Sequence, residues 1–106
     1  MKPLNFLGSS LDDLRNVPDE ARRATGFELR AVQSGLEPRD WKPMRAVGPG
    51  VKEIRIRVFG EWRVIYVAKL HGVVCVLHSF QKKTQKTSQH DIDLARHRYR
   101  QIRGNL

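Results

Sequence analysis

The chain has 106 residues, of which 40% are hydrophobic and 29% are charged. A chain of this length supplies one hydrophobic core but not two, so we expect a single domain over residues 1–106. The formal net charge is +9 and lies mostly in one half, with +1 on residues 1–50 and +8 on residues 51–106. This asymmetry favours a polyanionic partner, nucleic acid first and an acidic protein second, over a merely basic surface.

Several classes of protein are excluded by what the chain lacks. Cys75 is the single cysteine, so an internal disulfide framework and a multi-cysteine metal site are excluded. No apolar run reaches the ~18 residues of a membrane span, and the apolar part of the N-terminus is too short for a signal peptide. The four histidines have no ligand partners at metal-binding spacing, so we expect no metal and no other cofactor. We therefore expect a cytoplasmic protein that does not bind membranes.

The first third of the chain predicts a short strand and two helices. Residues 4–7 are mostly apolar and are expected to form an edge strand. Ser9 or Ser10 can cap a short helix, which the dipeptide at 17–18 interrupts. A second helix then starts at the proline of that pair and runs to about Ser34. Its predicted packing side consists of Ala21, Ala24, Phe27, Ala31 and Val32.

Three strand-like runs follow a loop over residues 35–50, which holds too many prolines and glycines for a regular element. The runs cover residues 53–58, 62–68 and 73–80. The first run alternates charged and apolar residues, whereas the other two are nearly continuous in β-branched and aromatic residues and suit the middle of a sheet. The separators at 60–61 and 71–72 are short enough for hairpin loops, so the sheet is expected to be antiparallel.

A basic, polar segment leads from the third run into a last helix. Thr87 or Ser88 is expected to cap this helix, with Asp91 in the position of a capping box. The packing stripe should be Ile92, Ala95, Tyr99 and Ile102, and a separate basic stripe should be Arg96, Arg100 and Arg103. The order β-α-α-β-β-β-α predicts an α+β domain whose mainly antiparallel sheet packs against the N-terminal helices, with a C-terminal helix.

This order, the strand GEWRVIYVAK and above all the segment VLHSFQKKTQKTS resemble the RelE/ParE superfamily of type II toxins. The most similar branch is that of the HigB-like, phage-derived toxins, which the opening of the chain and the WKPM loop also resemble. The resemblance implies a RelE-like fold and a cognate antitoxin of the helix-turn-helix type. It further implies an endoribonuclease that meets mRNA on the ribosome and cleaves it without metal, by attack of the 2′-OH.

The resemblance also assigns candidate roles to basic residues. Arg63 matches the arginine of the superfamily's strand pattern and can clamp a phosphate. Glu53 falls where RNA-cleaving members carry a basic residue, which argues against a lysine base from that strand. His78 has an ordinary pKa suited to proton transfer near neutrality, although a strand histidine is more often structural. The catalytic candidates are Arg63, Lys82, Lys83 and His78, and the RNA-binding candidates are Arg55, Arg57, Lys86, Arg96 and Arg100.

The register of the three strands decides whether these candidate residues lie on the same face of the sheet. A three-residue loop over 59–61 pairs Val58 with Trp62 and sets Arg63 opposite Arg57, whereas a two-residue loop would put Arg63 on the aliphatic face. Burial of an unpaired arginine costs several kcal/mol, so we expect the longer loop. A two-residue turn at 71–72 then sets Ile65 opposite His78. These registers predict one face with Arg55, Arg57, Arg63 and His78, and with Lys82 and Lys83 at its rim.

Two other functions stay open at this point. The ParE branch uses the same scaffold without catalysis and inhibits DNA gyrase, so the basic residues would serve binding alone. A phage-encoded nucleic-acid-binding module without toxicity is the other alternative. The lysine-rich loop beside an arginine face favours cleavage.

Overall fold

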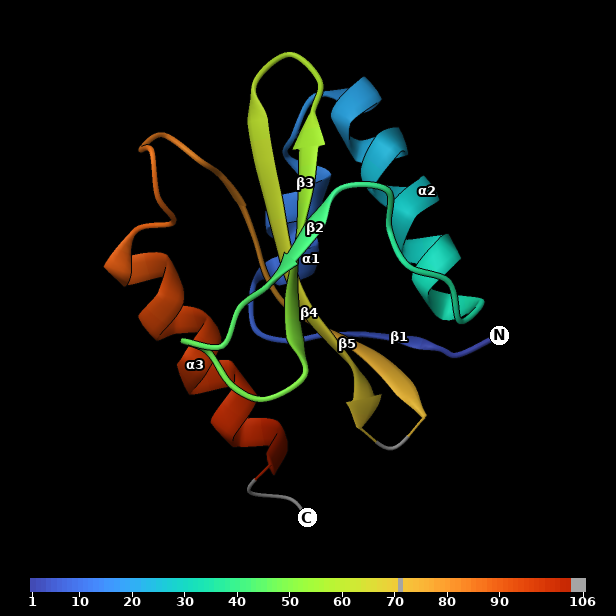
Figure 1. Cartoon of the computed structure of the whole chain (residues 1–106). Helices are drawn as coiled ribbons and strands as arrows, with labels where there is room; N and C mark the ends of the chain where they lie inside the picture. The colour runs from blue at the N-terminus through green and yellow to red at the C-terminus, as the bar shows by residue number, and fades with distance from the viewer. Residues whose placement is uncertain (71, 104–106) are drawn as a thin grey trace.

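The computed structural model describes residues 1–70 and 72–103, which form one five-stranded sheet with helices on both faces (Figure 1). In chain order the elements are β1 (Leu4–Phe6), α1 (Ser10–Arg15), α2 (Asp19–Gln33), β2 (Trp41–Pro43), β3 (Val51–Arg57), β4 (Glu61–Leu70), β5 (Val73–Gln81) and α3 (Gln89–Arg103). The strands lie in the order β1-β5-β4-β3-β2. Only β1 and β5 are parallel, and the other neighbours are antiparallel. The predicted α+β class is confirmed, and β1 is an edge strand as expected.

The strand β2 corrects the prediction that residues 35–50 hold no regular element. It pairs with β3 at the edge of the sheet, and Pro43 lies opposite Lys52. The ladder bonds next to Pro43 come from other residues, because the Met44 amide donates to the Val51 carbonyl at 2.9 Å. An edge strand needs an N–H only where a residue faces its single neighbour, so a proline at the alternate position costs no ladder bond.

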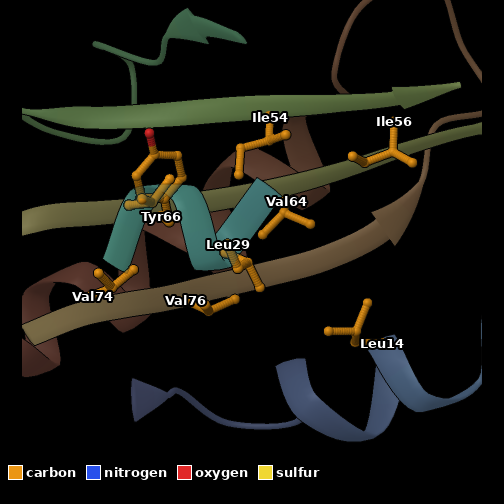
Figure 2. Close-up of a cluster of buried hydrophobic side chains, with 9 residues drawn as sticks. Leu14, Leu29, Ile54, Ile56, Val64, Tyr66, Val74 and Val76 are labelled. Atoms are coloured by element: carbon orange, nitrogen blue, oxygen red, sulfur yellow. The ribbon is translucent and has the colours of Figure 1, made fainter. Parts of the chain in front are cut away.

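The helices α1 and α2 cover one face of the sheet, where they enclose the first part of the core (Figure 2). Leu14 of α1 and Leu29 of α2 pack there against Ile54, Ile56, Val64, Tyr66, Val74 and Val76. The predicted packing side of α2 is partly wrong, because Phe27 is 61% exposed, under the guanidinium of Arg39. The buried residues of α2 are instead Ala21, Thr25, Glu28, Leu29 and Val32. Glu28 can lie on the buried side because its carboxylate accepts hydrogen bonds from the Arg39 amide and side chain.

The last helix, α3, covers the opposite face with the predicted stripe. Ala95 and Tyr99 are buried, and Ile92 and Ile102 pack beside them against residues of β3, β4 and β5. Ser88 caps α3 as predicted, although the Asp91 carboxylate accepts from the Ser88 hydroxyl and not from the Ser88 amide as in a full capping box. The Ser88 hydroxyl accepts from the Asp91 amide at 3.2 Å and donates to the Asp91 carboxylate at 2.7 Å. None of the helices in the described part of the chain is both long and apolar enough to cross a membrane.

The β3–β4 hairpin differs from the predicted register by two residues. Arg57 pairs with Glu61 and Arg55 with Arg63, so the connecting loop is Val58–Gly60. Phe59 and Gly60 both have positive φ, 52° and 132°, and the chain therefore reverses before Glu61. A shift of two residues preserves the face, so Arg63 still lies on the side of Arg55.

The β4–β5 pairing agrees with the prediction near the candidate site. Ile65 pairs with His78 and Arg63 with Phe80. The register shifts between Ile65 and Tyr66. Beyond this irregularity, Leu77 packs on the α3 side of the sheet, and His78 bonds to α3 through Asp91. The predicted turn at 71–72 includes residue 71, which lies outside the described residues.

Two glycines provide a matched test of this packing. A methyl group on Gly48 would overlap the ring of Tyr99, whereas one on Gly26 in α2 meets nothing within 4 Å. We expect Gly48→Ala to lower the free energy of unfolding by about 1–3 kcal/mol through overpacking. Gly26→Ala should raise it by about 0.5–1 kcal/mol through helix propensity. Urea unfolding of both variants measures the two changes, and a Gly48→Ala protein as stable as the parent would contradict the packing of α3 on the 44–50 loop.

Candidate functional site

Charged residues lie on the α3 side of the sheet near the β3–β4 hairpin, because Arg63 shares by period two the face of Ile65, which packs in the α3-side cluster. Glu53, Arg55 and Arg57 alternate along β3, and Glu61 and Arg63 alternate along β4. Period two places all five on the same face. The hairpin register sets Arg55 directly opposite Arg63.

A buried ion pair lies at the centre of this group. The side chain of Glu53 is fully buried and that of Arg63 is 3% exposed, and Arg63 Nε lies 3.7 Å from Glu53 Oε1. Lys42 of β2 places its Nζ 3.7 Å from the same oxygen. The hydroxyl of Thr87 donates to Glu53 Oε2 at 2.6 Å, so the loop after β5 is tied to the sheet at this carboxylate. Arg63 is therefore enclosed and does not lie on a solvated face.

From Arg63 a row of alternating charges leads to the surface. Arg63 Nη1 lies 3.2 Å from Glu61 Oε2, and Arg57 Nε lies 3.5 Å from the same oxygen. Asp40 then bridges Arg57 at 3.8 Å and Arg55 at 3.4 Å. Such half-exposed ion pairs contribute little to stability. The bridge through Asp40 nevertheless holds the guanidinium groups of Arg55 and Arg57 close together.

Lys82 completes the group at the end of β5. Its amide donates to the Glu61 carbonyl at 2.7 Å, which extends the β4–β5 pairing by one residue. Partial burial lowers the pKa of the Lys82 ammonium, and Arg63, Lys42 and Arg55 lower it further against the opposing effect of Glu53. These three cations are therefore near enough to Lys82 to act on its charge. We call Lys42, Arg55, Arg63 and Lys82 the cation cluster.

The other basic residues predicted from the sequence fall into two groups, one on the loop next to the cation cluster and one on α3. Lys83 and Lys86 are exposed on the loop that follows Lys82. Arg96 is occupied elsewhere, because its Nε donates to the Ala46 carbonyl at 3.0 Å and its Nη2 donates to it at 2.6 Å. Arg100 is exposed on α3, and no contact within the described residues brings it to the cluster.

His78 shares the face but lies under the first turn of α3. Its Nε2 is 2.7 Å from the Asp91 carboxylate, and its ring stacks on Phe80 with centroids 4.5 Å apart. Burial lowers the pKa of His78, while the hydrogen bond and charge of Asp91 act in the opposite direction. The hydrogen bond between this enclosed imidazole and Asp91, in the first turn of α3, links α3 to β5.

Sequence reasoning missed two charged residues of this region. Lys42 was overlooked because β2 was, although pairing of β2 with β3 sets Lys42 opposite Glu53. Arg98 is 7% exposed and donates to the Leu77 carbonyl at 2.9 Å. No signal in the helix pattern distinguishes it from its exposed neighbours. Within the part of the chain that the structure describes, no group of three His, Cys, Asp or Glu side chains could hold a metal ion.

Comparison with known proteins identifies the family. The model of the family described as "Phage derived protein Gp49-like (DUF891)" matches residues 12–100, which is most of the chain. The chain belongs to this family. The Gp49-like proteins are RelE-like toxins, and the five-stranded sheet of this Gp49-like chain is compatible with a RelE-like fold. No curated protein matches this sequence.

The buried ion pair predicts an asymmetric response to substitution. Arg63→Met leaves the Glu53 carboxylate buried beside Lys42 alone and should lower the free energy of unfolding by about 3 kcal/mol. Adding Glu53→Leu should restore most of that loss, because an apolar pair of similar volume needs no charge partner. Arg57→Met is the matched control, and this exposed variant should change stability by less than about 1 kcal/mol. Equal losses for Arg63→Met and Arg57→Met would contradict the buried pair.

The lowered pKa of His78 predicts a pH-dependent stability. The unfolded chain binds a proton at His78 below its ordinary pKa of 6.5, whereas the folded protein does not until a lower pH. The free energy of unfolding should therefore fall as the pH drops below 6.5 and level off below the folded pKa of His78. His78→Gln should flatten this slope, while His90→Gln at an exposed position should not. Urea unfolding between pH 8 and pH 5 measures the slope, and an unchanged slope in His78→Gln would refute the assignment.

Proposed function

We propose that this Gp49-like chain is the toxin of a type II toxin–antitoxin pair and an endoribonuclease that cleaves translated mRNA. The observation that carries the proposal is the cation cluster, in which Arg55 and Lys82 stand beside the buried Arg63 at the end of the sheet. Lys83 and Lys86 extend the positive charge along the next loop. Adjacent cations at a surface suit the phosphates of RNA.

The chemistry needs a bound phosphate and a proton for the leaving group. The 2′-OH of RNA loses its proton to solvent water, its oxygen bonds to phosphorus, and the bond to the 5′-oxygen breaks, leaving a 2′,3′-cyclic phosphate and, once the 5′-oxygen is protonated, a 5′-OH. Arg55 and Lys82 would stabilise the additional negative charge on the phosphorane. Lys82 has a lowered pKa, so it gives up a proton more readily than a free lysine and suits protonation of the 5′-oxygen.

Arg63 takes a supporting role in this proposal. Its side chain is 3% exposed and paired with two carboxylates, so direct contact with RNA would require the residues around it to move. Its charge still acts on the site through Lys82, whose pKa it lowers. Lys82 is therefore the cleaner position for a test of cleavage, since Arg63 also supports the fold.

The burial of Arg63 favours one alternative function, that of a non-catalytic toxin of the ParE kind that inhibits DNA gyrase. In that case the cations would bind a protein surface, and RNA would stay intact. Induced expression followed by mapping of mRNA 5′ ends separates the two functions. Cuts in register with codons support the endoribonuclease. Growth arrest without new 5′ ends, together with inhibited DNA supercoiling, would support the ParE-like function instead.

The partner in this proposal is an antitoxin of the helix-turn-helix type. Both outer strands of the sheet, β1 and β2, have one free edge, and exposed Arg100 and Arg103 lie on α3. A strand-forming or acidic segment of the antitoxin could use these features. Co-expression with the product of an adjacent small gene should restore growth. A chain that does no harm when expressed alone would contradict the toxin function.

The role of Lys82 predicts a specific pH profile for cleavage. Lys82→Met should lower the cleavage rate constant at least tenfold, since a donor to the transition state contributes about 2–4 kcal/mol. In the parent protein the rate should fall as the pH rises through the Lys82 pKa, below the ordinary value of 10.5, because the proton donor is then lost. Lys82→Arg should keep RNA binding and lose this inflection, since arginine stays charged.

Arg30→Met, at an exposed position of α2, is the control for a change of one charge and should cleave at the parent rate. A Lys82→Met protein that matches this control would remove Lys82 from the site.

A further inference from the structure

A pocket of about 330 Å³ lies between α1 and the end of β5. Its lining includes Asp13 and Asn16 from the end of α1, Trp62 from β4, and His78, Ser79 and Gln81 from β5. Among the described residues β1 pairs with β5 at residues 74–76 and no strand covers the edge of β5 from residue 78 onward, which is where the pocket lies. Its volume is near the lower end for ligand sites, which suits one small group rather than a peptide.

The open edge of β5 presents main-chain groups toward this pocket. In antiparallel pairing, alternate residues bond to the neighbouring strand, and the residues between them point their N–H and C=O groups the other way. The Lys82 amide bonds to Glu61 of β4, which assigns residues 78, 80 and 82 to the β4 side. Ser79 and Gln81 therefore direct a donor and an acceptor each to the open edge.

Two buried side-chain atoms at the pocket lack partners. Ser79 Oγ and His78 Nδ1 are both buried without a hydrogen bond within the described residues. Ser79 is 3% exposed and His78 is 5% exposed. Buried polar atoms in proteins are normally bonded. These two atoms mark the end of β5 at the pocket as incompletely hydrogen-bonded.

The lining also indicates the chemical class of the ligand. Trp62 offers an aromatic surface whose orientation is held by the hydrogen bond from its Nε1 to the Val58 carbonyl at 2.8 Å. No lysine or arginine lines the pocket, and Asp13 contributes a carboxylate, so a phosphate group is disfavoured there. An uncharged, flat ligand with N–H donors fits the aromatic wall, the carboxylate and the strand edge together.

We propose that this pocket binds a single nucleobase of the RNA strand, stacked on Trp62 and bonded to the edge of β5 at Ser79 and Gln81. The inference rests on the proposed function, because that function makes RNA the source of the base. The position of the pocket relative to the cation cluster agrees with it. Gln81 is followed directly by Lys82, so a strand whose phosphate meets the cation cluster could place a neighbouring base in the pocket. Asp13 accepts hydrogen bonds only, so bases with an exocyclic amino group (adenine, cytosine and guanine) should bind more tightly than uracil.

The test isolates the fluorescence of Trp62 and needs no cleavage. Trp41→Phe removes the other tryptophan, and the fluorescence lifetime of Trp62 is then followed during titration with each of the four nucleoside 5′-monophosphates. We expect saturable quenching by the adenosine, cytidine and guanosine nucleotides and at least threefold weaker binding of the uridine nucleotide. Ribose 5-phosphate carries the phosphate without a base and should leave the lifetime unchanged.

Substitutions in the same background locate the binding. Ser79→Val fills the floor of the pocket and should weaken nucleotide binding at least tenfold, whereas Ser34→Val at the exposed end of α2 should leave it unchanged. Asn16→Phe closes the rim from an exposed position and replaces Ser79→Val should that variant fail to fold. Absence of quenching by every nucleotide, quenching by ribose 5-phosphate, or full binding by the folded pocket variants would each overturn the proposal. Because no bond is broken in this assay, its outcome is independent of whether the protein cleaves mRNA.

Discussion

The buried pair of Glu53 and Arg63 is the interaction on which the functional end of this molecule depends. Both side chains lie on adjacent central strands and are almost fully enclosed, so each needs the other for charge compensation. Lys42 from the edge strand and Thr87 from the loop after β5 converge on the same carboxylate. Three segments far apart in the chain are thereby held at one end of the sheet, and Lys82 is held next to them.

This arrangement divides the sheet into a part that supports the fold and a part that carries charge. Along the α3 side, Ile65, Cys75 and Leu77 pack under Ala95 and Tyr99. Toward the β3–β4 hairpin the same face changes to alternating arginine and glutamate. A rigid, apolar base next to a charged end is the arrangement expected for a site that must hold cations close together against their mutual repulsion.

How much of this could be predicted differs from element to element. The α3 stripe and its Ser88 cap follow from local spacing and were predictable. The face of Arg63 was predictable too, because an unpaired arginine cannot lie on the aliphatic side. Its burial was not, since that depends on Thr87, which reaches Glu53 from 34 residues away along the chain. The strand β2 was missed because its proline disrupts a local pattern without disrupting an edge ladder.

The candidate site, like the fold, could be predicted from the sequence only in part. Arg55 and Lys82 were identified as basic residues of a familiar motif, and their electrostatic coupling emerged only from the fold. His78 was named for its ordinary pKa, whereas its burial, which lowers that pKa, and its bond to Asp91 emerged only from the fold. The pocket at the edge of β5 had no signal in the sequence, because it arises from where β1 ends.

The salt dependence of RNA binding tests the central claim, that the cation cluster holds phosphates, most directly. A single-stranded RNA with 2′-O-methyl groups cannot be cleaved, so its affinity can be measured across a range of salt concentrations. The logarithm of the binding constant should fall linearly with the logarithm of salt, with a slope of about −0.7 for each phosphate contact. Lys82→Met should reduce the magnitude of the slope by about 0.7, the value of one contact, and Arg30→Met should leave it unchanged. A flat salt dependence, or equal slopes for the parent and Lys82→Met, would contradict the account.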